Sequence, residues 1–169
     1  MTIDPQLLTG LGAALSIFLA SAGSAIASSH SGIYAVRGKD LKAFPPIIIS
    51  GVLAIYGIIV SVILVGKFKD DMTQTEGYRN LSAGLSVGLA CCVSGLGMAS
   101  FMRQINEHST VPSPPITSDT PEREPLVGRR MNGGINAHEP VNFIHLLLSL
   151  VFLEAIGLYG LVVALFLMG

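Results

Sequence analysis

Long apolar segments separated by short polar ones are the main pattern along this chain of 169 residues. Four of these segments are long enough to cross a bilayer as a helix, which takes about 20 residues. They run from about Gln6 to His30, Ala43 to Gly66, Asn80 to Met102 and Asn142 to Met168. We therefore predict an all-α membrane protein with four transmembrane helices, forming a single membrane domain over residues 1–169.

Composition agrees with a membrane protein and argues against other classes. Hydrophobic residues make up 50% of the chain and charged residues only 12%, and the mean hydropathy is +0.63. The net charge of −1 gives no indication of nucleic-acid binding. The first apolar segment has no basic residue ahead of it and no clear cleavage site, so we interpret it as a helix rather than a secretory signal peptide. Cys91 and Cys92 are adjacent, cannot bridge each other without strain, and are interpreted as small packing residues.

The basic residues predict the orientation in the membrane. Seven of them lie in or beside the first and third connections between helices, against three in the second. Because cytosolic loops are enriched in Lys and Arg, loops one and three are predicted to be cytosolic and both termini lumenal or exterior. The residues counted are Arg37, Lys39, Lys42, Arg103, Arg123, Arg129 and Arg130 on one side, and Lys67, Lys69 and Arg79 on the other.

Glu154 is the candidate functional residue. It is the only Asp, Glu, Lys or Arg between Pro140 and Gly169, and it lies close to the middle of that apolar stretch. A carboxylate at the bilayer centre costs roughly 2.5–3.5 kcal/mol on insertion scales, and a low dielectric disfavours its charged form. An acid that is neutral in lipid and ionised beside a cation or water can carry a proton. We interpret Glu154 as proton-binding; the alternative is a structural carboxyl that is hydrogen-bonded between helices.

The second and fourth apolar segments align without gaps at an offset of 103 residues. The run Ile-Tyr-Gly at 55–57 matches Leu-Tyr-Gly at 158–160, and Glu154 falls opposite Gly51. The acid is therefore present in only one of the two copies.

The first and third segments match more weakly, at an offset of 74 residues that pairs Gly23 with Gly97. Together the two alignments predict two tandem helical hairpins in parallel orientation. The first hairpin, residues 6–66, has no acid, whereas the second, residues 80–168, contains Glu154.

Small residues distinguish the first and third helices from the other two. Such residues let helix backbones approach closely in lipid, whereas the bulky second and fourth helices suit contact with acyl chains. This contrast predicts a ring of subunits with helices one and three inside and Glu154 at the lipid-facing rim. The alternative is a compact four-helix bundle with a small-residue core. The small residues are Ser16, Ala20, Ser24 and Ser28 in the first helix, and Gly84, Gly88, Cys91, Gly95 and Ala99 in the third.

Three runs resemble the 16 kDa proteolipids of V-type ATPases. LSAGLSVGL at 81–89 is similar to the start of their third helix, and LEAIGLYGLVVAL at 153–165 to their proton-binding helix. GVLAIYG at 51–57 resembles the matching first-half segment, which lacks an acid in subunits c and c′. In subunit c″ the key Glu lies in that first-half position, so Gly51 argues against c″. The resemblance covers residues 7–102 and 140–168 and implies a c-ring protomer of c or c′ type.

The resemblance implies a proton-carrying rotor subunit of a vacuolar-type rotary ATPase, with ATP hydrolysis on other subunits. Glu154 would take a proton from a cytosolic half-channel in stator subunit a, cross lipid in neutral form, and release the proton after meeting a stator arginine. The implied partners are other proteolipid subunits in a homo- or hetero-oligomeric ring, stator subunit a, rotor stalk subunit d and the bilayer. The implied location is the vacuolar or another endomembrane, or the plasma membrane. The chain is expected to be no enzyme on its own and to have no cofactor, metal site or nucleic-acid partner.

Protons are favoured over sodium as the carried ion, because a dehydrated hard cation needs several oxygen ligands. Near Gly51 the sequence supplies only Ser50 as a polar residue. Tyr56 is a candidate hydrogen-bonding partner of the protonated Glu154; a packing role is the alternative. Two other functions remain alternatives. A membrane scaffold or pore would not need Glu154, and a small-molecule transporter would be expected to have more polar groups within the membrane.

The third loop departs from the family, in which it is short and rich in glycine. Residues 104–141 are long, polar and rich in proline, a composition typical of a flexible segment. We interpret this cytosolic loop as a tolerated insertion. The alternative is a contact with the rotor stalk or a phosphorylation target at Ser113 or Thr117.

Overall fold

The computed structural model describes residues 4–37, 44–108 and 143–169. Within these ranges the chain forms four α-helices: α1 (Pro5–Arg37), α2 (Pro45–Gly66), α3 (Gln74–His108) and α4 (Phe143–Met168). Each is long and apolar enough to cross a membrane. The prediction of an all-α membrane protein with four transmembrane helices is therefore confirmed.

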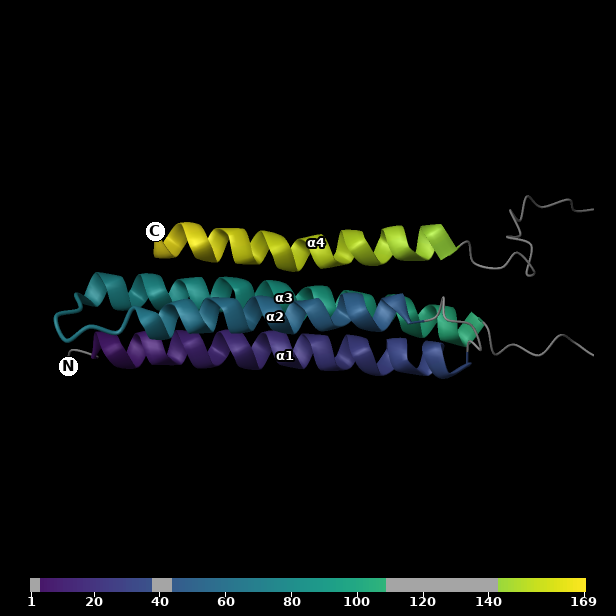
Figure 1. Ribbon diagram of the computed structural model, residues 1–169, viewed down its shortest axis with the longest axis horizontal. Helices are drawn as coiled ribbons and strands as arrows, with labels where there is room; N and C mark the ends of the chain where they lie inside the picture. The colour runs from purple at the N-terminus through teal and green to yellow at the C-terminus, as the bar shows by residue number, and fades with distance from the viewer. Residues whose placement is uncertain (1–3, 38–43, 109–142) are drawn as a thin grey trace, which may run out of the picture.

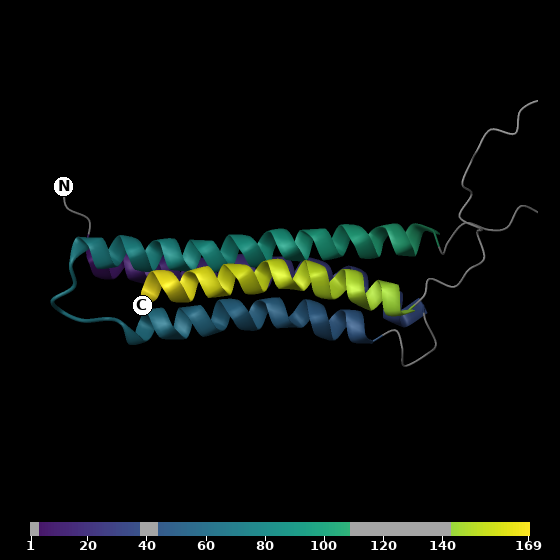
Figure 2. The ribbon, with the colours of Figure 1, turned by 90° about the horizontal axis from the view of Figure 1, so that it is seen from above.

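The four helices run side by side along one axis (Figure 1). α1 packs most extensively against α3, while α2 packs against α1 and α4 packs against α3. α2 also contacts both α3 and α4. α1 and α4 lie on opposite sides of the bundle (Figure 1), and α2 and α3 lie on either side of α4 when the bundle is seen from above (Figure 2). The start of α1, the end of α4 and the α2–α3 turn lie at one end of the bundle (Figure 1). We call this end the terminal end.

α1 and α3 are longer than the apolar segments that predicted them. α1 continues to Arg37 instead of ending near His30, and α3 covers residues 74–108 instead of 80–102. Residues 104–108, assigned from the sequence to the third loop, are thus helical. The rest of that loop, with the candidate phosphorylation sites Ser113 and Thr117, lies outside the described residues.

Polar contacts explain why α3 extends beyond its apolar part. At its start, the Thr73 backbone N and Oγ1 donate to Glu76 Oε2 at 2.9 and 3.0 Å, which forms a capping box. Near its end, Arg103 pairs with Glu107 at 2.9 Å across one helical turn. Hydropathy identifies the part of a helix that can lie in lipid, whereas caps and ion pairs stabilise the parts that reach into water.

α1 and α3 approach closely at two places, each with a glycine on both helices. A Cβ atom built on Gly12 would lie 2.9 Å from a carbonyl oxygen of α3, and one built on Gly23 would lie 2.7 Å from another. Gly84 and Gly95 of α3 face Gly12 and Gly23 in return. Since no side chain fits at these distances, the predicted role of small residues in the packing of the first and third helices is confirmed.

The serine-rich ridge of α1 faces α2. Ser16 Oγ donates to the carbonyl of Gly57 at 3.2 Å, and Ser24 Oγ donates to the carbonyl of Ser50 at 2.8 Å. Between them, a Cβ atom on Gly57 would lie 2.5 Å from the Cβ of Ala20. Close contact and interhelical hydrogen bonds therefore hold α1 to α2, as is common where lipid removes the hydrophobic drive for helix association.

The same pair of hydrogen bonds recurs between α3 and α4. Ser86 Oγ donates to the carbonyl of Gly160 at 3.4 Å, and Ser94 Oγ to the carbonyl of Leu153 at 2.5 Å. The two acceptors lie 103 positions after those in α2, in agreement with the sequence alignment, but the two donors lie 70 positions after those in α1. The offset of 74 for the first and third helices was therefore wrong by about one helical turn.

Candidate functional site

Glu154 lies near the middle of α4, and its side chain is partly buried. The hydroxyl of Tyr56 on α2 donates a 2.8 Å hydrogen bond to Glu154 Oε1. The two residues are 98 positions apart in the chain. The fold thus brings together the two residues that the sequence singles out.

The protein-facing wall beside this pair is apolar and closely packed. Gly157 lies one turn after Glu154, and a Cβ atom there would lie 2.7 Å from Leu53 Cδ2 and 3.4 Å from Cys91 Sγ. Leu53, one turn before Tyr56, and Cys91 of α3 are both fully buried. The lack of a side chain at Gly157 therefore lets α2 and α3 pack against α4 beside the acid, as expected for Cys91 as a small packing residue.

The backbone next to the acid is fixed by α3. Ser94 is fully buried and donates its hydrogen bond to the carbonyl of Leu153, the residue directly before Glu154. The Leu153 side chain packs over Gly97, where a Cβ atom would lie 3.1 Å from Leu153 Cδ2. These contacts set the height and rotation of α4 at the acid. Ser94 was not predicted from the sequence; the signal that identifies it is Ser24, its counterpart 70 positions earlier.

The outer side of the site is apolar and exposed. Phe152 and Tyr159 of α4 are each 68% exposed, and Ile55 of α2 is 51% exposed. In a bilayer such side chains contact acyl chains, because apolar surface is compatible with lipid. Glu154 thus lies between a packed protein wall and a lipid-compatible surface.

The site has few oxygen donors. Among the described residues, no group of three or more His, Cys, Asp or Glu side chains is placed to hold a metal ion. The Tyr56 hydroxyl supplies the one side-chain hydrogen bond that the described part of the chain makes to Glu154. The arrangement can hold a single proton on the carboxyl group, with a phenol alongside.

Several known proteins to which this chain is similar belong to one family. No protein-family model matches the chain. The chain is 32% identical over 165 residues to the V-type proton ATPase subunit c′ of Candida glabrata, covering 92% of this chain and 84% of that protein. The same identity and coverage hold for subunit c′ of Saccharomyces cerevisiae. The chain is 28% identical over 163 residues to the human V-type proton ATPase 16 kDa proteolipid subunit c. That alignment covers 93% of this chain and 88% of the human protein.

Four membrane-crossing helices with a partly buried acid in one of them define a multi-pass helical membrane protein with a titratable group in a membrane span. The sequence identity to known proteins, which extends over 92% to 93% of the chain, identifies the family within that class. The chain belongs to the family of V-type proton ATPase proteolipid subunits that includes c and c′. The family resemblance seen in the sequence is thereby confirmed. Members of this family are membrane subunits and not the catalytic subunits of the ATPase, as expected for a chain that is no enzyme on its own.

Proposed function

We propose that this chain is a proton-carrying rotor subunit of a vacuolar-type rotary ATPase, in which Glu154 binds and releases one proton as a ring of subunits turns. The observation that carries the proposal is the position of Glu154. It is a lone acid at mid-membrane depth, partly buried, and hydrogen-bonded to Tyr56 beside an exposed apolar surface. An ionisable residue at this depth is expensive and is usually functional.

Position alone can switch the proton affinity of such a carboxyl. Facing lipid, the charged form is disfavoured by desolvation, so the group stays neutral. Next to a fixed cation, or in contact with water, the charged form is favoured and the proton is released. A stator arginine and two stator half-channels, as the family resemblance implies, would provide these two environments.

A proton fits the site better than a sodium ion. Sodium, like other hard cations, requires several oxygen ligands around it. The neighbours Leu53, Cys91 and Gly157 provide none from their side chains, and Tyr56 provides a single hydroxyl. A carboxyl group with one phenolic partner is sufficient for a proton.

The recurring hydrogen bonds support two tandem hairpins as the organisation of the chain, residues 6–66 and 80–168. The serine-to-carbonyl pair between α1 and α2 has its counterpart between α3 and α4. In the proposed ring the closely packed α1 and α3 form the inner wall, whereas α2 and α4 form the outer wall. Other proteolipid copies would be the neighbours in the ring, and stator subunit a and rotor stalk subunit d the further partners.

The proposed location is a vacuolar or other endomembrane, or the plasma membrane. α1 begins and α4 ends at the same end of the bundle as the α2–α3 turn, and this part of the sequence carries fewer basic residues than the segments in and beside the first and third connections. The positive-inside rule then puts the terminal end in the lumen or exterior and loops one and three in the cytosol.

The substitution Glu154→Gln tests the carrier role, because an amide approximates the shape of the neutral acid but cannot titrate. We expect complexes that contain only the Glu154→Gln chain to assemble and to lose ATP-driven acidification of sealed vesicles. The matched control is Glu107→Gln, since Glu107 is exposed and paired with Arg103 near the end of α3. Acidification retained by the Glu154→Gln complex would contradict the proposal.

A hydrophobic carbodiimide provides a second readout. Such a reagent partitions into lipid and reacts with protonated carboxyls. It should modify Glu154 and should label Glu76 and Glu107 at the helix ends far less. If the unmodified chain and Glu154→Gln were labelled equally, Glu154 would not be a protonated carboxyl that the reagent reaches within the membrane.

A further inference from the structure

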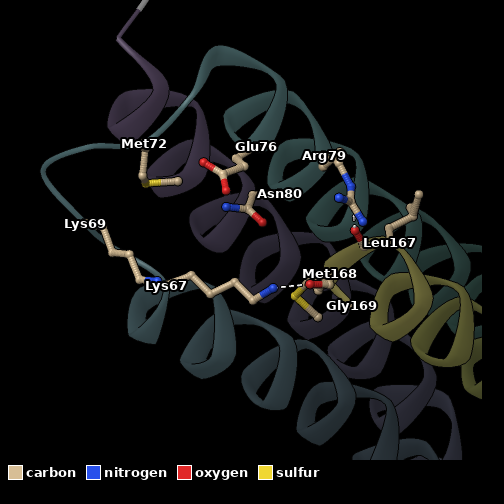
Figure 3. A pocket seen from close by; sticks show the side chains of 9 residues that line it. All are labelled: Lys67, Lys69, Met72, Glu76, Arg79, Asn80, Leu167, Met168 and Gly169. Atoms are coloured by element: carbon tan, nitrogen blue, oxygen red, sulfur yellow. Dashed lines mark hydrogen bonds between the residues drawn. The ribbon is translucent and has the colours of Figure 1, made fainter.

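A basic hollow lies at the terminal end of the bundle, away from Glu154. It has a volume of about 230 Å³ and lies between the α2–α3 turn and the end of α4 (Figure 3). The residues that line it are Lys67, Lys69, Met72, Glu76, Arg79, Asn80, Leu167, Met168 and Gly169. Three of them are cations and one is an acid.

The acid and two of the cations already have partners. Glu76 accepts hydrogen bonds from the backbone N and Oγ1 of Thr73 and so serves the cap of α3. Lys67 Nζ donates to the carbonyl of Met168, and Arg79 Nε donates to the carbonyl of Leu167 at 3.2 Å. These bonds occupy the last carbonyls of α4, which would otherwise repel an anion at the negative end of the helix dipole.

Donor capacity remains after these bonds. An ammonium group has three N–H donors and a guanidinium group has five, of which Lys67 and Arg79 each use one in the bonds above. Lys69 adds a third cation from the turn. Asp70 and Asp71 of the same turn are exposed and do not line the hollow. Within the part of the chain that the structure describes, the side chains lining the hollow carry a net positive charge and N–H donors that these bonds do not use.

The hollow lies at the ends of two membrane-spanning helices, where lipid headgroups are expected. Lys67 directly follows the end of α2, and Leu167 and Met168 belong to the last turn of α4. Aromatic side chains surround this level: Phe68 is 42% exposed and Tyr78 is 50% exposed. Exposed aromatic residues of this kind are typical of the boundary between membrane and water.

We propose that this hollow binds the phosphate group of an anionic lipid headgroup. Lys and Arg side chains recognise phosphate through charge-assisted hydrogen bonds, and the fork of a guanidinium group suits its oxygens. The exposed apolar faces of α2 and α4, with Val62, Val65 and Phe166, continue from the hollow along the bundle and would contact the acyl chains. A phosphate ion from water has the same chemistry as the headgroup but makes no use of these faces.

Lys69 distinguishes an anion-binding site from a group of cations that only caps the end of α4. If the cations only capped α4, Lys67 and Arg79 would be sufficient, because they make the bonds to its carbonyls. The Lys69 side chain lines the hollow without contributing to that cap. Replacing it should weaken anion binding and leave the helices in place.

The test is native mass spectrometry of the assembled, delipidated complex, titrated with phosphatidylglycerol, with phosphatidylcholine and with inorganic phosphate in separate experiments. We expect saturable binding of phosphatidylglycerol in preference to phosphatidylcholine. Lys69→Gln should weaken phosphatidylglycerol binding by roughly fivefold, as expected for one basic charge near a lipid headgroup. Lys69→Arg should restore it. Arg103→Gln, at the opposite end of the bundle, is the matched control and should have no effect.

Each outcome decides the proposal. Binding of inorganic phosphate that is lost in Lys69→Gln, without preference for the anionic lipid, would support the anion site and assign it to free phosphate. Equal affinity of the unmodified chain and Lys69→Gln for phosphatidylglycerol would overturn the proposal. Acidification by the Lys69→Gln complex reports on the proton carrier separately.

Discussion

Ser94 of α3 donates a 2.5 Å hydrogen bond to the carbonyl of Leu153, one residue before the acid Glu154. Ser24 of α1 makes the equivalent bond to the carbonyl of Ser50, one residue before Gly51. The same hydroxyl-to-carbonyl contact therefore fixes the helix beside the acid in the second half of the chain and beside a glycine in the first.

Ser94→Ala should alter the site without touching the carboxyl group. Loss of one interhelical hydrogen bond is expected to cost about 0.5–1.5 kcal/mol of stability and to change the rate at which a hydrophobic carbodiimide labels Glu154. Ser24→Ala removes the equivalent bond beside Gly51 and is the matched control. It should lower the melting temperature of the complex similarly but leave the labelling rate unchanged. Equal labelling rates in the two variants would show that Ser94 does not position the acid.

Tyr56→Phe should preserve the packing and slow proton transport. A hydrogen bond between neutral groups contributes about 0.5–1.5 kcal/mol, and a loss of about 1.4 kcal/mol corresponds to a tenfold change in rate. We expect ATP-driven acidification to fall by up to roughly tenfold with assembly unchanged. Tyr159→Phe is the control, because Tyr159 occupies the equivalent position in α4 and is 68% exposed. A Tyr56→Phe complex as active as the Tyr159→Phe complex would leave Tyr56 with a packing role only.

Gly23→Ala should destabilise the protein although alanine favours helices. The new Cβ would lie 2.7 Å from the carbonyl oxygen of Cys91, so α1 and α3 must separate, at a cost of about 1–3 kcal/mol. Gly32→Ala meets no atom within 4 Å and should stabilise α1 by about 0.5–1 kcal/mol. Thermal denaturation of the purified complex, followed by loss of the assembled ring, measures both. A shift in the same direction for the two variants would contradict the close α1–α3 contact.

The repeated contacts also predict a meeting point between copies. Tyr56 of α2 meets Glu154 of α4 within one chain, and their counterparts 103 positions away are Tyr159 and Gly51. If α2 and α4 alternate around the outer wall of the ring, Tyr159 of one copy faces Gly51 of the next. A Cβ atom on Gly51 meets nothing within 4 Å in the single chain, so this position has room for a neighbour.

Cysteine cross-linking tests this contact. Chains carrying both Gly51→Cys and Tyr159→Cys should form dimers and higher ladders on a denaturing gel after oxidation, with Cys91 and Cys92 replaced by Ala in every chain. The control pair, Tyr56→Cys with Glu154→Cys, should cross-link within one chain and run as a monomer. Only monomers from both pairs would rule out the alternating arrangement of α2 and α4.

The sequence predicted the membrane spans well because they depend on a local property. Apolar length sets where a helix can cross lipid, and a lone Glu154 in such a stretch is visible without a structure. Tyr56 was a candidate partner of Glu154 from the sequence, and its hydroxyl donates to that carboxyl in the structure. The ends of α3 were missed because a capping box and an ion pair, rather than hydropathy, set them.

The alignment of the first and third helices failed for a physical reason. It matched glycines, pairing Gly23 with Gly97, but in the structure Gly23 lies against Gly95 and Gly12 lies against Gly84. The glycines of the two helices therefore follow the close α1–α3 contact and do not mark equivalent positions. The equivalent positions are the serines that bond to the next helix, such as Ser94. In the sequence these serines cannot be told apart from other small residues. Only the structure shows which small residues point toward the next helix and which lie in the α1–α3 contact.

Gly51 has a consequence for the energetics of a rotary pump. Its counterpart Glu154 carries the proton in the proposed mechanism. Each chain of four helices therefore moves one proton each time it passes the stator, whereas a chain with an acid at both positions would move two. In a ring with a given number of helices, the free energy of each ATP is then divided among half as many protons. Moving one proton against 100 mV requires about 2.3 kcal/mol, so halving the number doubles the potential against which each can be driven. A glycine at position 51 thus favours a steep gradient over a fast flow of protons.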